Sequence, residues 1–475
     1  MASQQPESPW PRSRPSASAT HAALATVLAI ALCGCSSWSP TTPPVPDIAV
    51  PAAWSGSNAS VLPATSLAQW WQRFNDPLLS SLVTQALQAN TSIQSARAAL
   101  QQSRALRDVK GAALLPGVAG SASAQRSKSG EQDASNSFRV GLDASWEIDV
   151  FGGNRSALSA AEADTQAAAA TLADTQVSVA AEVALAYLQL RGQQARLQIA
   201  RDNLTSQHET LQITDWRAQA GLITSLEVEQ ARAASEQTGA QIPALETSIA
   251  TSRHSLAVLT GQPPAALELL LTPAQPVPHA APDLALSIPA QTLRQRADVR
   301  AAEHRISAAL ARVSAADAAR FPGFSIGGSL GLNALTLGTL TNSASVVSAL
   351  MGSVSIPLFD GGAARAQVQA QEAALEQARA GYQAVVLTAL KDVEDALVAL
   401  AGDRTRWGHL QNAATAAANA ALLAQNRYSS GLIDFQTVLQ TQRTLLTAQD
   451  SVASASTDIS TDHVRLYKAL GGGWN

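Results

Sequence analysis

The sequence is short of charged and aromatic residues and has almost no cysteine. Of its 475 residues, 14% are Asp, Glu, Lys or Arg and 4% are Phe, Trp or Tyr, whereas 46% are hydrophobic, largely through alanine. This composition is typical of long helices that pack through alanine, and it disfavours a compact enzyme core. The formal net charge of −4 gives no reason to expect nucleic acid as a partner.

Both cysteines lie at the end of an apolar run near the N-terminus. The run covers about residues 22–33, follows two arginines and is too short to span a bilayer as a helix, but it suits a signal peptide. It ends in the sequence LCGC at 32–35, which resembles the lipobox of bacterial lipoproteins. A lipobox predicts cleavage before Cys35 and acylation of that cysteine, palmitate included. A simple secretory signal is the alternative.

The lipobox divides the N-terminal region into two segments. It predicts a lipoprotein signal peptide over residues 1–34 and a lipidated tether over 35–69, a stretch rich in Ser and Pro. Because Cys33 leaves with the signal, the mature protein has no second cysteine with which to form an intrachain disulfide.

The longest regular pattern in the sequence runs from Ser137 to Val150. Every second residue from Phe138 onward is apolar, and the residues between them are polar or glycine. Successive side chains of a strand point to opposite faces, so the pattern predicts one long strand with an apolar and a polar face. Four charged residues belong to the polar face, which we expect to line water: Arg139, Asp143, Glu147 and Asp149.

A very long helix is predicted directly after this strand. The strand ends at the sequence FGG at 151–153, and the next turn signal is AGLI at 220–223. A helix from about Asn154 to Trp216 is on the order of 90 Å long, which no small globular domain contains. After the turn, Thr224 and Glu227 have the spacing of a capping box and predict the start of a return helix.

Three further local signals define the rest of the first half. Asp76 and Pro77 suit the N-cap and first position of a helix, which we expect to run unbroken to about Ala113. Residues 117–127 predict a strand of small residues. Pro243 lies inside the return helix and should kink or break it.

The second half of the chain repeats the first. Three motifs recur 206 to 210 residues later: LLPG at 114–117 as RFPG at 320–323, VFGG at 150–153 as LFDGG at 358–362, and AGLI at 220–223 as SGLI at 430–433. We interpret residues 70–261 and 292–475 as two structural repeats, joined over 262–291 by a proline-rich linker. The second repeat predicts strands at about 324–332 and 353–358.

Four such strands cannot form a closed barrel alone. Strands of about ten residues with this alternation cross outer membranes, where no strand edge stays unpaired, and about eight strands is the minimum. We therefore predict an α+β membrane protein that forms a homo-oligomer. Each chain would give four strands to a shared β-barrel and long coiled-coil helices to a shared helical barrel.

These motifs resemble the TolC family of outer-membrane efflux proteins, and within it the NodT-type lipoproteins of RND pumps. The duplication, the glycine junctions, the two turns and the closing sequence LYKALGGGW at 466–474 all match. One departure is RADV at 296–299, where the family usually has proline second; this affects the start of the local helix. The resemblance implies a trimer with a twelve-stranded barrel in the outer membrane and a helical barrel in the periplasm.

The resemblance also implies partners and site residues. Family members take substrates from an inner-membrane pump through a periplasmic adaptor and conduct them passively. The adaptor docks on the turns that close the tunnel: Ala220, Gly221, Leu222, Ile223, Ser430, Gly431, Leu432 and Ile433. Candidates for the aperture are Glu227, Tyr428, Asp434, Thr437 and Gln440. The alternative for Glu227 and Asp434 is simple helix capping.

No other chemistry is indicated. Five histidines, His208, His254, His304, His409 and His463, lie singly without metal-ligand spacing. The glycine pairs lack the Lys-Ser/Thr of a phosphate loop. We expect no cofactor, no metal and no enzymatic activity. The alternatives to an efflux duct are a duct for type I protein secretion and a non-conducting lipoprotein scaffold.

Overall fold

The computed structural model describes residues 50–51, 53–54, 69–280 and 293–472, all of which belong to one compact unit, 43–475. The predicted signal peptide, Cys35, most of the tether, residues 281–291 of the linker and the end of the closing motif lie outside the described residues.

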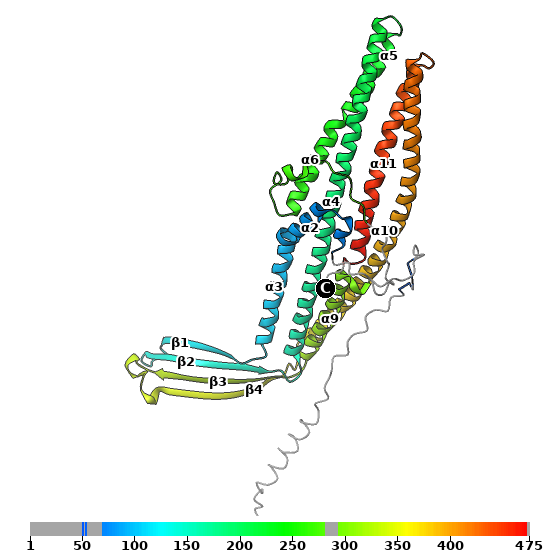
Figure 1. Cartoon of the computed structure of the whole chain (residues 1–475). Helices are drawn as coiled ribbons and strands as arrows, with labels where there is room; N and C mark the ends of the chain where they lie inside the picture. Colours follow the sequence, from blue (N-terminus) through cyan, green and yellow to red (C-terminus); the bar gives the residue numbers. More distant parts are fainter. Residues whose placement is uncertain (1–49, 52, 55–68, 281–292, 473–475) are drawn as a thin grey trace, which may run out of the picture. The chain divides into compact units, whose positions relative to one another are not determined.

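The described elements follow the same order twice (Figure 1). The first series is η1 (Trp70–Phe74), α2 (Pro77–Ala89), α3 (Thr91–Ala112), β1 (Gly117–Ser127), β2 (Ser135–Ile148), α4 (Gly153–Gln219), α5 (Ser225–Gly239), α6 (Gln241–Leu259) and α7 (Glu268–Leu271). The second is α9 (Ala297–Ala318), β3 (Gly323–Ala334), η2 (Leu337–Thr339), η3 (Ser343–Ser345), β4 (Val346–Ser355), α10 (Ala363–Ser429) and α11 (Phe435–Ala469). In both, a helix leads into strands, and a helix of 67 residues leads from the strands to a turn and a return helix.

The four strands form one antiparallel sheet in the order β1-β2-β3-β4. The predicted strand at 117–127 is confirmed, and the alternating strand is confirmed with its end at Ile148. The expected strand at 353–358 is wrong in position, because β4 covers Val346–Ser355. Ser355 pairs with Gly323, the first residue of β3, so the ladder ends there, and Pro357 has no N–H with which to extend it.

Each face of the sheet has one character across several strands. Val140 lies opposite Ala122 and Leu332, whereas Arg139 lies opposite Ser123 and Asn333. The apolar and polar faces predicted for β2 therefore continue onto its neighbours. Along β1 and β4 every residue is exposed.

The first predicted helix is broken in two, contrary to the expectation of one helix to Ala113. Asn90 ends α2 and caps α3, since its side chain accepts from the backbone N–H groups of Ser92 and Ile93. Its amide also donates to the carbonyl of Leu259 at 2.8 Å, at the end of α6. Asp76 caps α2 as predicted, with Pro77 at the first position.

The first return helix is interrupted as Pro243 predicted. It ends as α5 at Gly239 and resumes as α6 at Gln241, so the break falls within the turn before the proline. The second return helix, α11, has no proline and runs for 35 residues. No helix in the described ranges is long and apolar enough to cross a membrane.

The largest core cluster surrounds the middle of α4. It brings Trp70 of η1 against Tyr467 of α11, with ring centroids 5.4 Å apart, and it includes Leu188 and Tyr187. The Tyr187 hydroxyl donates to Asp76 at 2.6 Å, and burial raises the pKa of Tyr187 to about 12. The core thus joins the ends of both repeats to the first long helix.

Candidate functional site

The two turns at the far end of the long helices have the same backbone geometry. In the first, Leu222 N–H donates to the Arg217 carbonyl at 2.9 Å, and Gly221 has a φ of 67°. In the second, Leu432 N–H donates to the Arg427 carbonyl at 2.9 Å, and the φ of the central glycine is 72°. This pattern ends a helix with a left-handed residue, for which glycine is preferred.

Each turn presents one large apolar side chain to the surface. Leu222 is 71% exposed and Leu432 is 74% exposed, although the isoleucine after each is partly covered. The remaining turn residues, Ala220, Gly221, Ser430 and Gly431, are exposed. The predicted docking residues therefore lie together at the two tips, and their role in docking stays a proposal.

The acidic aperture candidates are both helix caps. Glu227 and Thr224 form the predicted capping box at the start of α5, which is confirmed. Asp434 caps α11 and accepts from the Thr437 N–H at 2.9 Å and from its hydroxyl at 2.6 Å. The Thr224 hydroxyl lowers the pKa of Glu227, and the Thr437 hydroxyl lowers that of Asp434. Both carboxylates keep their charge to lower pH than usual while capping.

The other aperture candidates lie on two different surfaces. Thr437 and Gln440 are exposed and follow Asp434 at steps of three, so these residues share a face of α11. Tyr428 instead is 8% exposed and packs on Phe435, with ring centroids 5.4 Å apart. Its hydroxyl is buried without a hydrogen-bond partner in the described part of the chain. Tyr428 is therefore a packing residue between helices.

A contact that the sequence did not indicate joins the two tips. Arg217, in the last turn of α4, lies over the ring of Tyr428 at 4.5 Å from the centroid. Its guanidinium donates to the carbonyls of Tyr428 at 3.2 Å and Ser429 at 3.4 Å, in the last turn of α10. A cation over a ring and at a helix C-terminus is favourable on both counts. The repeat-equivalent residue, Arg427, is exposed.

At the opposite end, three of the four charged residues predicted on the strand face lie on β2. Arg139, Asp143 and Glu147 are exposed on the polar face, and Ser121 donates to Asp143 at 2.9 Å. The prediction that Asp149 belongs to the strand face is wrong, because this residue lies beyond the end of β2.

Asp149 is a helix cap and not a wall residue. Its carboxylate accepts from the backbone N–H groups of Asn154 at 3.0 Å and Arg155 at 2.8 Å, in the first turn of α4. Asp360 does the same for α10 by accepting from the N–H groups of Gly362 and Ala364, both at 2.8 Å. Carboxylates at both junctions satisfy the free N–H groups of the long helices and complement their dipoles.

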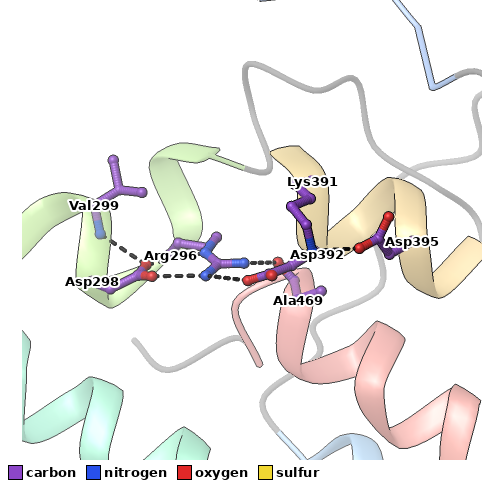
Figure 2. A network of polar contacts seen from close by, with 7 residues as sticks. All are labelled: Arg296, Asp298, Val299, Lys391, Asp392, Asp395 and Ala469. Atoms are coloured by element: carbon purple, nitrogen blue, oxygen red, sulfur yellow. Dashed lines mark hydrogen bonds and ion pairs between the residues drawn. The ribbon is translucent and has the colours of Figure 1, made fainter. Parts of the chain in front are cut away.

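A clasp closes the junction where α11 ends and α9 begins (Figure 2). We use the term Arg296 clasp for Arg296, Asp298, Asp392 and the carbonyl of Ala469. Arg296 donates to that carbonyl at 2.9 Å and forms ion pairs with Asp298 at 2.7 Å and Asp392 at 3.3 Å. The Arg296 side chain is 10% exposed, whereas those of Asp298 and Asp392 are 29% and 40% exposed, so the cation is shielded while its partners are partly open to water.

The first repeat contains the neutral equivalent of this clasp. Asn90 precedes α3 as Arg296 precedes α9, and Leu259 lies 210 residues before Ala469. In each repeat the residue before the short helix donates to the carbonyl that ends the return helix. In each repeat a short helix and a return helix are thus joined end to end beside the long helices, although the first return helix is itself divided into α5 and α6.

Within the described residues, no three His, Cys, Asp or Glu side chains are grouped so that they could hold a metal. Of the five single histidines, His463 is buried: its Nδ1 lies 3.0 Å from the Ile459 carbonyl and its Nε2 lies 3.1 Å from Arg404. Burial lowers the pKa of His463. These contacts fit the neutral ring of a packed histidine.

Comparisons with known proteins agree on one family. The family model described as outer membrane efflux protein matches residues 82–262 and 288–472. The pyoverdine export outer membrane protein OpmQ of Pseudomonas putida is 34% identical over 460 residues, which is 94% of this chain and 96% of that protein. Nodulation protein T of Rhizobium leguminosarum is 29% identical and covers 90% of this chain and 89% of its own.

The solved structures confirm the fold. The outer-membrane channel OprN superimposes with a TM-score of 0.84 at 35% identity and covers 92% of this chain and 100% of its own. The resemblance to TolC-like channels that the motifs indicated is confirmed. The chain belongs to the outer membrane efflux protein family.

Proposed function

We propose that this chain is the outer-membrane exit duct of a tripartite efflux system. Three copies form a twelve-stranded barrel in the outer membrane and a helical tunnel in the periplasm. Drugs or other small molecules enter from an inner-membrane pump, of the RND class, and a periplasmic adaptor. The duct is passive, and its partners supply the energy.

The observation that carries the proposal is the open sheet. Strands β1 and β4 each pair with a single neighbour within the described chain, which leaves two unpaired edges. The same sheet exposes large apolar side chains on one face, including Leu142 at 55% and Leu350 at 83%. A surface with this face in lipid tolerates no open edge, so further copies must complete it.

The helices support the same assembly. Val398, Leu422 and Leu423 on α10 are 57–66% exposed. Apolar side chains on a long helix gain stability only when another surface covers them. A neighbouring copy in a helical barrel provides that surface.

The tips support a closed, openable end. Arg217 holds the α4 tip to the α10 tip through weak, partly exposed contacts of 3.2–3.4 Å. Such contacts are a small barrier that an adaptor bound to Leu222 and Leu432 can overcome. We also propose that Cys35 is acylated and that lipid anchors the mature N-terminus in the outer membrane.

Single-channel conductance in planar bilayers tests the proposal with the full-length protein. We expect a conducting trimer and a higher open probability for Arg217→Ala, because this change removes the link between the tips. Arg427→Ala is the matched control, since that equivalent residue is exposed and should leave conductance unchanged. A protein that inserts but never conducts, even as Arg217→Ala, is a scaffold and contradicts the proposal.

Acylation has a separate test. Labelled palmitate should appear on the wild-type protein in cells and be lost in Cys35→Ser, while the trimer still forms. Labelling that persists in Cys35→Ser would contradict a lipid at this residue.

A further inference from the structure

Several residues that form contacts between the two repeats have equivalents, one repeat away, that are exposed in the chain. These exposed equivalents predict which residues meet between copies. This inference rests on the shared barrel proposed above and goes on to name the contacts. In the described chain, the first repeat packs against the second through β2 and β3 and through α4 and α11. For each such contact, the repeat spacing is added to the number of the first-repeat residue and subtracted from that of the second-repeat residue. The resulting pair is the predicted contact between the second repeat of one copy and the first repeat of another.

The rim of the sheet provides the first contact. Phe151, after β2, stacks on Phe321, before β3, with ring centroids 4.8 Å apart. The repeat-equivalent residues are Phe359, 208 residues after Phe151, and Leu115, 206 residues before Phe321. In the chain Phe359 is 94% exposed and Leu115 is 68% exposed. Both halves of the contact exist, but one chain does not bring them together.

The strands provide the second contact. Leu142 of β2 lies opposite Leu330 of β3. Adding 208 to the first number gives Leu350 of β4, and subtracting 206 from the second gives Ala124 of β1. The same shift moves the pair Ser145 and Gly327 to Ser353 and Ser121. It thus predicts an antiparallel register between β4 of one copy and β1 of the next.

The side-chain character of the two edge strands tests this register independently, because the shift uses residue numbers alone. On the apolar side, Leu350 and Val354 then lie opposite Ala124 and Gly120. Arg126 is the single charged residue on that side of β1, and Ser348 is the single polar one on that side of β4. The predicted register places these two opposite each other, whereas a slip of two residues places Arg126 against Val346 or Leu350.

The helices provide the third contact. Gly192 of α4 lies so close to Thr457 of α11 that a Cβ added to the glycine would stand 3.1 Å from the threonine Cβ. Moving both by 210 residues gives Gly402 of α10 and Thr247 of α6, so the same two residue types recur. Apart from the adjoining residues and backbone of its own helix, nothing in the described chain lies within 4 Å of the Cβ position of Gly402, and Thr247 is exposed. What distinguishes Gly402 from the other open glycines of α10 is that the repeat shift places a threonine opposite it, as Thr457 lies opposite Gly192.

We propose that the second repeat of each copy docks on the first repeat of another copy at these positions. Ser353 lies opposite Ser121, Phe359 covers Leu115, and Gly402 receives Thr247. Glycine and threonine let α10 and α6 approach closely, while the rim contact removes two large apolar side chains from water.

Cysteine pairs in the full-length protein test the register. Ser121→Cys with Ser353→Cys should cross-link copies on oxidation and give a ladder up to the trimer on a denaturing gel. Opposed positions on neighbouring strands suit a disulfide, whereas pairs displaced by two residues exceed its span. Ala119→Cys or Ser123→Cys with Ser353→Cys are the matched controls, and we expect about tenfold less product from them. Each single variant measures background.

A second pair tests the helices independently. Thr247→Cys with Gly402→Cys should cross-link copies, whereas Thr247→Cys with Gly408→Cys should not, because Gly408 lies about 9 Å further along the helix. Gly402→Val should lower the temperature at which the trimer dissociates, and Gly408→Val should leave it unchanged.

The outcomes separate this inference from the proposed function. Displaced pairs that cross-link as well as the predicted ones, or no cross-link between copies in protein that still conducts, overturn the inference and leave the duct in place. Protein that neither assembles nor conducts under reducing conditions overturns the duct itself. Cross-linking by both predicted pairs and by neither control supports the proposed contacts.

Discussion

The helices α4 and α10 occupy equivalent places in the two repeats, yet they are buried to very different extents. Each has 67 residues and begins at a glycine junction, but α4 buries 20 residues and α10 buries 10. The difference arises because α4 packs along much of its length against elements of both repeats, whereas α10 packs mainly against α9 and α11 of the second repeat and meets the first repeat near its tip. Equivalent positions in the two repeats are therefore not equally buried. The additional exposed surface of α10 is the surface that another copy must cover.

Equivalent core positions should show the largest difference. Leu188 of α4 is fully buried, and Val398, 210 residues later, is 66% exposed. We expect Leu188→Ala to lower the free energy of unfolding by about 2–5 kcal/mol, because it leaves a cavity in the main core. Val398→Ala should cost about 1 kcal/mol or less, because only a neighbouring copy covers this side chain. Thermal or denaturant unfolding in detergent measures both, and equal losses would break the comparison.

The second largest difference in stability should lie between the Arg296 clasp and its neutral equivalent at Asn90. Arg296→Ala removes the donor to Ala469 and leaves Asp298 and Asp392 without their shared cation, so we expect a loss of about 2–3 kcal/mol. Asn90→Ala removes a cap and one hydrogen bond, at about 1–2 kcal/mol. Chemical unfolding measures both losses.

Salt provides a control for this pair. High salt should reduce the effect of Arg296→Ala more than that of Asn90→Ala, since only the first clasp is charged. An Asn90→Ala loss larger than that of Arg296→Ala would show that charge adds nothing to the second clasp.

The caps of the two return helices should be nearly equal. Thr224→Ala and Asp434→Ala each remove a cap at an exposed tip, so each should lower the helix stability by about 1 kcal/mol. Hydrogen exchange of the first turn of α5 and α11 measures this locally. If only Asp434→Ala also changed channel conductance, that aspartate would have a gating role beyond capping, which would sharpen the contrast between the repeats.

The smallest expected difference between the two return helices is in how their stability depends on pH. Burial raises the pKa of Asp462 on α11 to about 6, with Asp403 also raising it and Arg465 opposing. The folded protein therefore binds this proton more readily than the unfolded chain, whose aspartate has an ordinary value of 3.8. The charged carboxyl costs stability above about pH 6, and the cost fades as the pH falls toward 4.

Asp462→Asn removes this titration. The variant should exceed the wild type in stability above about pH 6, with the advantage shrinking toward pH 4. Thermal unfolding at several pH values measures the difference. The equivalent residue in the first repeat is Ser252, and Ser252→Ala should shift stability equally at all pH values. A constant difference for Asp462→Asn would contradict the raised pKa.

Local signals were sufficient for much of the architecture. Strict alternation located β2, glycine in a left-handed turn located both tips, and the spacing of Thr224 and Glu227 gave a capping box that the structure confirms. Pro243 gave the break in the return helix. Each of these depends on residues within one turn or one strand of each other.

Contacts between distant residues were not accessible in the same way. The apolar residues Leu82, Ala86, Ala89 and Ile93 keep helical steps of three and four residues across Asn90. Nothing local therefore predicted the break, where the Asn90 side chain bonds to a carbonyl 169 residues away. Arg217 meets Tyr428 across 211 residues, and no short motif records that. The position of β4 depended on where its partner β3 begins. The duplication could have predicted the break at Asn90, because Asn90 and Arg296 precede equivalent helices in the two repeats.

The end-to-end joining of short helices at the two clasps restricts how the protein's length can evolve. At 1.5 Å per residue, α4 and α10 are each about 100 Å long. Residues inserted into one of them must be matched in one of the shorter helices beside it, and again in the other repeat, or the turns and junctions no longer align. Changes in reach should therefore occur as coordinated insertions at four places, in multiples that restore the helical seam.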